Sequence, residues 1–154
     1  MQRFEATQRG SRLKAILATL AIGLPGSALA ADLTEQTPTV VEMRLGTASG
    51  EARFDPDQLT LEAGKMYILR LVNPTQKNYY FNSPRLADAV YTRKVSFFDE
   101  AGKPAGDVYG AIRRIEVKAG RSAEWWMLPV RTGVFDDLMS RRNEPDMKGV
   151  IEIR

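Results

Sequence analysis

Short apolar segments separated by turn residues run from about position 40 to the end of the chain. Val40 to Leu45 alternates between apolar and charged residues, as a half-buried strand does, and Met66 to Val72 is apolar enough for a central strand. Further strands are predicted over 79–81, 91–98, 112–117, 124–128, 134–138 and 149–153, with a stub over 59–61, a short helical segment over 85–90 and an exposed loop over 99–106. This spacing predicts an all-β sandwich of about seven or eight strands with at most one short helix.

The first thirty residues have the order of a secretory signal peptide. Four basic residues precede an apolar run over 15–24, and Ala28-Leu29-Ala30 ends the segment. Basic, apolar and small-residue regions in that order predict cleavage after Ala30. The alternative is an uncleaved anchor, but the apolar run is shorter than the roughly 18–20 residues of a spanning helix. We therefore expect residues 31–154 to form one periplasmic domain without membrane insertion.

The net charge belongs to the predicted leader. The chain has 22 Lys and Arg against 19 Asp and Glu, a net charge of +3. The first thirty residues hold four basic residues and one acidic residue, so the remaining chain is balanced. A balanced domain offers no electrostatic basis for nucleic-acid binding.

Four segments, in order, carry a family resemblance. Residues 54–67 follow the pattern F-x-P-x-x-L-x-L-x-A-G-x-x-Y, and residues 115–124 begin I-x-V-x-A-G and end in Glu. Residues 129–135 read P-V-x-x-G-x-F, and residues 146–153 contain M-x-G before an apolar strand. Together these segments resemble the cupredoxin (plastocyanin and azurin-type) family from Phe54 to Arg154. The resemblance implies a Greek-key β-sandwich with a copper site at one end.

The positions of the family's copper ligands carry the wrong side chains. By the resemblance, Tyr79 takes the place of the first histidine, and Met139 that of the cysteine. Arg142 or Asn143 takes the place of the second histidine, and Met147 that of the axial methionine. Type 1 copper needs a thiolate and two imidazoles, and the chain has no cysteine and no histidine. We therefore expect a domain without a type 1 site.

Two functions of different kinds remain open. The first is a non-catalytic accessory module that binds an envelope protein through Tyr79, Tyr80, Phe81, Arg142 and Asn143, because aromatic residues are common in binding hot spots. These aromatic side chains would otherwise pack the core, with one of Trp125 and Trp126 also facing inward. No nucleophile–base pair is available without histidine or cysteine, so we expect no enzyme.

The second function is copper handling, with Cu(I) held by the thioethers of Met139 and Met147, with or without ligands from a partner. Soft sulfur suits Cu(I), although methionine also fills gaps in cores. No other cofactor is predicted. Arg113-Arg114 could face an anionic partner or keep a strand soluble, and Arg141-Arg142 lie in a charged loop. The sequence does not identify the partner or the oligomeric state.

Overall fold

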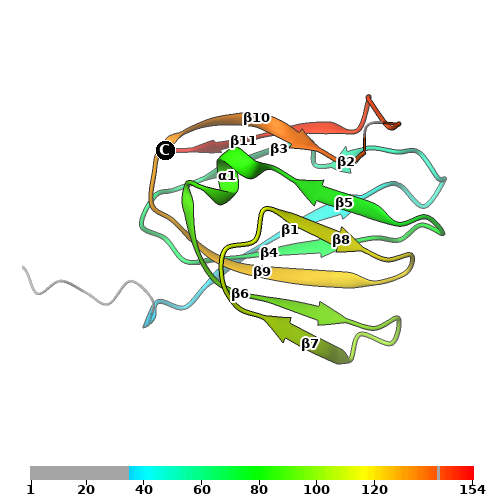
Figure 1. Ribbon diagram of the computed structural model, residues 1–154, viewed down its shortest axis with the longest axis horizontal. Coiled ribbons are helices and arrows are strands. Elements are labelled where there is room, and N and C mark those ends of the chain that lie inside the picture. Colours follow the sequence, from blue (N-terminus) through cyan, green and yellow to red (C-terminus); the bar gives the residue numbers. More distant parts are fainter. Residues whose placement is uncertain (1–34, 142) are drawn as a thin grey trace, which may run out of the picture. The chain divides into compact units, whose positions relative to one another are not determined.

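The structure is a computed structural model that describes residues 35–141 and 143–154. The predicted leader and Arg142 lie outside the described residues. The unit that ends at Arg154 is a sandwich of two β-sheets (Figure 1). The first sheet has the order β2 (Phe54–Asp55), β1 (Thr39–Leu45), β4 (Tyr67–Val72), β9 (Ser122–Pro129), β6 (Val90–Phe98) and β7 (Pro104–Val108). The second has the order β3 (Gln58–Leu61), β11 (Lys148–Ile153), β10 (Gly133–Met139), β5 (Tyr79–Asn82) and β8 (Arg114–Val117).

The chain crosses between the sheets many times. β4 and β5 are consecutive in sequence but belong to different sheets, and the same holds for β9 and β10. β1 pairs with β4 in parallel and β3 pairs with β11 in parallel, whereas the other described pairs are antiparallel. Parallel neighbours require long connections, so segments distant in sequence meet at the same end of the sandwich.

Alternating side chains from both sheets fill the core. In β9, Ala123, Trp125 and Met127 are buried, while Glu124 and Trp126 between them face outward and are partly exposed. Trp125 packs edge-on against Phe81, with ring centroids 5.9 Å apart, and its Nε1 donates a hydrogen bond to Thr92 Oγ1. A buried indole N–H normally finds such a partner. The prediction that one of the two tryptophans faces inward is therefore confirmed for Trp125.

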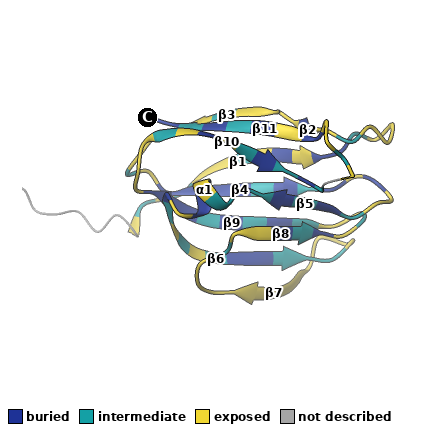
Figure 2. Cartoon of the chain, turned by 45° about the horizontal axis from the view of Figure 1, so that its top comes forward, coloured by how far each residue is buried: buried dark blue, intermediate teal, exposed yellow. Residues whose placement is uncertain are grey.

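The predicted all-β sandwich with one short helix is confirmed. The helix, α1 (Pro84–Ala87), is shorter than the segment predicted over 85–90. Eleven strands are described, more than the seven or eight expected, because β2 and β7 carry weak apolar patterns. All five residues of β7 are exposed, and this edge strand overlaps the end of the predicted loop over 99–106 (Figure 2). Within the described residues, no helix is both long and apolar enough to cross a membrane.

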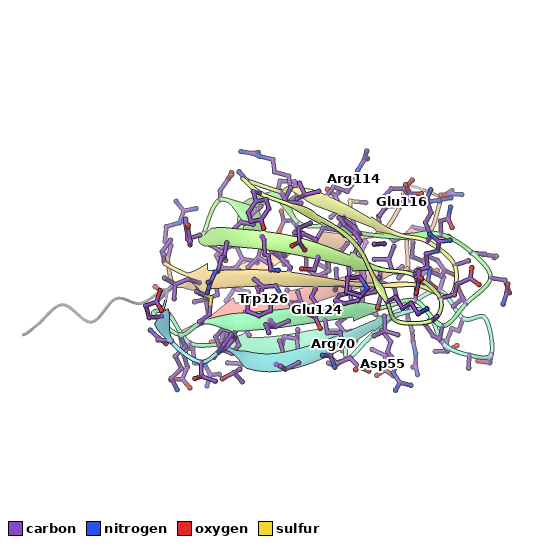
Figure 3. The ribbon with its side chains drawn as sticks, turned by 90° about the horizontal axis from the view of Figure 1, so that it is seen from below. Asp55, Arg70, Arg114, Glu116, Glu124 and Trp126 are labelled. Atoms are coloured by element: carbon purple, nitrogen blue, oxygen red, sulfur yellow. The ribbon has the colours of Figure 1, made fainter. Side chains whose placement is uncertain are left out.

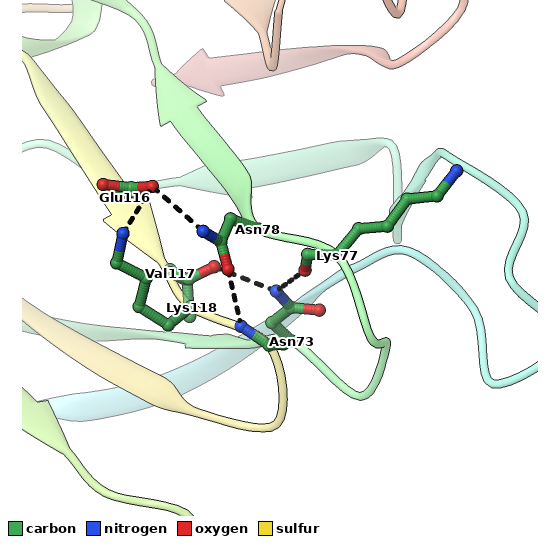
Figure 4. A network of polar contacts seen from close by, with 7 residues as sticks. Asn73, Lys77, Asn78, Glu116, Val117 and Lys118 are labelled. Atoms are coloured by element: carbon green, nitrogen blue, oxygen red, sulfur yellow. Dashed lines mark hydrogen bonds and ion pairs between the residues drawn. The ribbon is translucent and has the colours of Figure 1, made fainter.

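A buried asparagine holds the connection between β4 and β5. The side-chain amide of Asn73 donates to the carbonyl oxygens of Lys77 and Val117 at 2.7 and 2.9 Å (Figure 4). Its Oδ1 accepts hydrogen bonds from the backbone N–H and the hydroxyl of Thr75. Because all these groups are satisfied within the protein, the start of β5 is fixed against β8, and with it the outward direction of Tyr80.

Candidate binding site

A β-bulge in the β10–β11 hairpin decides which side chains face inward. Phe135 pairs with Ile151 but Leu138 pairs with Gly149, so β10 contains one residue more than β11 between these pairs. Such an extra residue shifts the alternation of all later side chains. Met139 therefore faces outward beside its partner Lys148, and Ser140 turns inward and is buried. At this end of β10 the inward residue is thus Ser140, and Met139, which the resemblance places at the family's cysteine position, lies on the outer face.

The inward side chains at this end form a small, closed group. Tyr79 and Met147 have no exposed surface, and Ser140 is nearly as buried. The Ser140 hydroxyl donates to a Glu144 carboxylate oxygen at 3.1 Å and accepts a hydrogen bond from the backbone N–H of Tyr80. Burial, and secondarily the negative charge of Glu144, raise the pKa of the Tyr79 phenol, although the charge of Arg141 acts in the opposite direction.

This donor set does not fit a type 1 copper ion. A neutral phenol, a hydroxyl and one thioether replace the thiolate and imidazoles that such an ion requires. In the part of the chain that the structure describes, there is also no cluster of three or more Asp, Glu, His or Cys that could hold a metal.

Met139 and Met147 do not come together. The backbone N–H of Ser140 donates to the carbonyl oxygen of Met147, so Ser140 and Met147 lie opposite each other across the hairpin. Met147 is in the core, while Met139 is half-buried on the outer face of the sheet. The two side chains project from opposite faces, because neighbouring residues in a strand point in opposite directions. The hairpin therefore does not bring the sulfur atoms of Met139 and Met147 together, which corrects the prediction of a Cu(I) site built from both.

The predicted partner-binding aromatics also divide between two faces. Tyr79 and Phe81 are buried in the core, and Phe81 packs against Phe54 as well as Trp125. Their side chains are therefore not available to a partner in this structure, because the strand alternation directs both inward. Tyr80 lies between them and faces outward. Asn143 is exposed and lines a different hollow, beside Glu144 and Met147.

Tyr80 forms part of a hollow on the outer face of the second sheet. The hollow has a volume of about 510 Å³, and we call it the arginine–tyrosine hollow. Its lining residues come from β5, β8 and the end of β10: Tyr80, Asn82, Arg114, Met139, Ser140 and Arg141. β5 and β10 are bridged at one described pair, Met139 with Asn82, and both of these residues line the hollow.

Two guanidinium groups flank the Tyr80 ring. The Cζ atoms of Arg114 and Arg141 lie 5.2 and 4.8 Å from the ring centroid, within the range of cation–π contacts. Among the described residues neither arginine forms an ion pair, and the buried Nε of Arg141 has no hydrogen-bond partner. Two positively charged groups with unused N–H donors therefore lie at one hollow.

A nearby carboxylate is already engaged. Glu116 lies opposite Tyr80 on β8 and forms an ion pair of 2.9 Å with Lys118 (Figure 4). The hydrogen bond from Lys118 lowers the pKa of Glu116, with smaller contributions from Tyr80 and from the positive charge of Arg141. Glu116 thus forms its ion pair with Lys118, and among the described residues it forms none with Arg114 or Arg141.

The outer face of the first sheet is different in character. Arg70 and Glu124 are cross-strand partners, and the guanidinium donates to one carboxylate oxygen at 2.9 and 3.1 Å. Beside them, Lys94 Nζ lies 5.2 Å from the Trp126 ring centroid. Figure 3 labels Arg70, Glu124 and Trp126 on this sheet, and Arg114 and Glu116 on β8. On this face Arg70 already pairs with Glu124, so its charge is less available to a bound anion.

Sequence reasoning named Tyr80 but gave Arg114 and Arg141 no specific role. The sequence pattern allows Arg114 either to face an anionic partner or to keep its strand soluble, and it places Arg141 in a charged loop. The inward Ile115 and Val117 could have placed Arg114 on the outer face of its strand. The contact between that strand and β5 could not be read from the sequence, because it joins residues more than thirty positions apart.

Comparisons with known structures identify the fold. No family model matches the sequence, and no curated protein matches it. The fold is similar to that of a multicopper oxidase from Campylobacter jejuni, with a TM-score of 0.52 at 13% identity, over 77% of this chain and 30% of the oxidase. A multi-copper oxidase from Pediococcus acidilactici gives a TM-score of 0.54 at 12% identity, over 94% of this chain and 31% of the other. The chain thus spans less than a third of the length of these oxidases.

An amicyanin structure overlaps 79% of this chain at 11% identity, with a TM-score of only 0.40. At such identities the likeness to the two oxidases concerns the fold alone. The protein has a cupredoxin-like β-sandwich fold, in agreement with the resemblance in its sequence.

Proposed function

We propose that this protein is an exported, non-catalytic accessory module that binds another envelope protein and works without a type 1 copper ion. The observation that carries the proposal is the arginine–tyrosine hollow on an outer sheet face, where Tyr80 meets two arginines that form no ion pair with the described residues. Tyrosine and arginine are the residue types most enriched at binding hot spots.

Three further observations support this proposal. The first thirty residues have the pattern of a cleavable signal peptide. The chain contains neither cysteine nor histidine, so it cannot itself supply the thiolate and imidazoles of a type 1 site. The inward residues Tyr79, Ser140 and Met147 are packed into the sandwich, which leaves the outer face as the surface for recognition.

Site-specific photo-crosslinking in the native cells tests the proposal. A photoreactive phenylalanine derivative at Met139 places the reactive group in the hollow, and the same group at Val40 serves as control. Val40 is 49% exposed and lies on the first sheet, away from β5 and β10. We expect a discrete crosslinked product from position 139, identifiable by mass spectrometry, and none from position 40. No product from either position, or the same products from both, would contradict the accessory role.

A further inference from the structure

The polar groups that remain available in the arginine–tyrosine hollow are mainly donors. Arg114 is exposed, and Arg141 has a buried Nε without a partner. The side-chain amide of Asn82 also makes no described hydrogen bond. A guanidinium has five N–H donors and no acceptor. A negatively charged hydrogen-bond acceptor would therefore satisfy the groups of this hollow.

Among the described residues, the carboxylates near the hollow form no ion pair with the two arginines. Glu116 pairs with Lys118 and interacts with Arg141 only through its charge, and Glu144 accepts the Ser140 hydroxyl. Lys148 adds another positive charge beside Met139 on the same face of the hairpin. A negatively charged group of another molecule would complement the positive charge that remains on this face.

The size and lining of the hollow distinguish a polypeptide from a small free anion. About 510 Å³ is far more space than one carboxylate or phosphate group occupies, and the hollow is open to the surface. The Tyr80 ring and the Met139 side chain supply apolar surface next to the two guanidiniums. This combination suits an acidic side chain, whose methylene groups contact the apolar part while its carboxylate receives the N–H groups.

We infer that the arginine–tyrosine hollow binds a glutamate or aspartate side chain from an acidic segment of a partner polypeptide, with Arg114 and Arg141 as the residues that contact its carboxylate. The inference rests on the proposed function, and it adds the chemistry of the partner. It also assigns a role to Arg114 that the sequence pattern left open.

Calorimetric titration of the full chain tests this directly. The probe is a tetra-glutamate peptide with blocked termini, and the comparison ligands are tetra-glutamine and inorganic phosphate. We expect tetra-glutamate to bind, and to bind more weakly at high salt because the contacts are ionic. Tetra-glutamine should not bind. Phosphate should bind much more weakly than the peptide, since it makes no apolar contact.

Charge-matched variants locate the binding. Arg114→Gln and Arg141→Gln should each weaken tetra-glutamate binding about tenfold, the typical effect of one lost charge-assisted contact. Arg44→Gln makes the same change of net charge on the first sheet, where Arg44 contacts Glu42, and should leave the affinity within about twofold. Arg141→Lys keeps the charge but loses the planar fork, so an intermediate affinity is expected.

Several results would overturn the inference. These are no binding of tetra-glutamate to the unmodified chain, equal weakening in Arg44→Gln, or phosphate binding as tight as the peptide and competitive with it. If Arg141→Gln does not fold, Arg114→Gln carries the test, because Arg114 is exposed and bears no described ion pair.

The crosslinking experiment separates this inference from the proposed function. If the crosslinked product at position 139 persists in an Arg114→Gln, Arg141→Gln double variant, the accessory role stands and the inference of an acidic partner segment is wrong. If tetra-glutamate binds but no crosslinked product forms, the hollow accepts acidic side chains and the accessory role is wrong.

Discussion

At the scale of single residues, Tyr79 combines complete burial with an unpaired hydroxyl. Its side chain has no exposed surface, and among the described residues its hydroxyl oxygen has no hydrogen-bond partner. A Cβ at Gly46 would lie only 2.8 Å from the Tyr79 ring, so this ring packs directly against the backbone of Gly46. The ring therefore contributes to packing, while burial of the unpaired hydroxyl opposes folding.

Replacing the Tyr79 hydroxyl should change stability mainly at high pH. Because burial raises the pKa of Tyr79 above the ordinary value near 10, both folded and unfolded chains are protonated below that pH. Above it, the unfolded chain releases the proton more readily, so the free energy of unfolding falls as pH rises through the folded pKa. Tyr79→Phe should remove this part of the alkaline loss and change stability at pH 7 by less than about 1 kcal/mol. Denaturant unfolding across pH 7 to 12 measures both effects.

Tyr67→Phe is the matched control, because the Tyr67 hydroxyl oxygen accepts a hydrogen bond from the backbone N–H of Glu62. That variant should lose about 1 kcal/mol at neutral pH. A loss of more than about 2 kcal/mol in Tyr79→Phe at pH 7 would show that the hydroxyl has a partner.

At the scale of elements, the bulge in β10 has an identifiable cause. The residues at the bulge, Asp136 and Asp137, both contact the segment that begins α1. Asp137 accepts hydrogen bonds from the Ser83 hydroxyl at 2.7 Å and from the backbone N–H of Arg85 at 2.8 Å. A carboxylate is favourable at the first N–H groups of a helix. These contacts stabilise the extra residue and hence the inward direction of Ser140.

A close approach of the strands beyond this bulge depends on Gly149. A Cβ there would lie 2.8 Å from the carbonyl oxygen of Asp57 and 2.8 Å from Leu138 Cδ2. The Asp57 carbonyl cannot easily move, because it accepts the backbone N–H of Val150 at 2.8 Å. We expect Gly149→Ala to lower the free energy of unfolding by about 1–3 kcal/mol, as overpacking does. Chemical denaturation gives this value.

Gly106→Ala provides the comparison, since Gly106 lies in the exposed strand β7 and a Cβ there would meet nothing within 4 Å. Its free energy of unfolding should stay within about 0.5 kcal/mol of the unmodified protein. Equal losses in the two variants would contradict the steric explanation.

At the scale of the whole molecule, the two methionines of the predicted Cu(I) site lie on opposite faces of the second sheet. Met147 is in the core, and Met139 is on the outside of the second sheet. Their separation by the sheet leads to a clear expectation for copper.

Anaerobic titration with Cu(I) against a competing chelator should give the same result for the unmodified protein, Met139→Leu and Met147→Leu. The reason is that no single ion can contact two sulfur atoms on opposite faces of a sheet. Uptake of one equivalent that is lost in either variant would contradict this and would require a rearranged hairpin.

Much of the architecture could be predicted because it depends on local pattern. Alternating apolar residues and turn residues determined the sandwich, its single short helix and the inward Trp125. The strands β2 and β7 lie outside the predicted set, because β2 has only two residues and the exposed edge strand β7 needs no apolar face. The absence of cysteine and histidine, and the signal-peptide pattern, are likewise properties of the sequence alone.

The candidate site could be predicted only in part, because it depends on long-range contacts. Tyr80 was named from its sequence, but its neighbours Tyr79 and Phe81 were assigned to the surface although alternation in β5 buries them. The bulge beside α1 determined that Ser140 turns inward and Met139 outward. The pairing of β5 with β8 brought Arg114 to the Tyr80 ring, and the pairing of β5 with β10 brought Met139 to the same hollow. These arrangements join residues far apart in the chain, so only the tertiary structure could decide them.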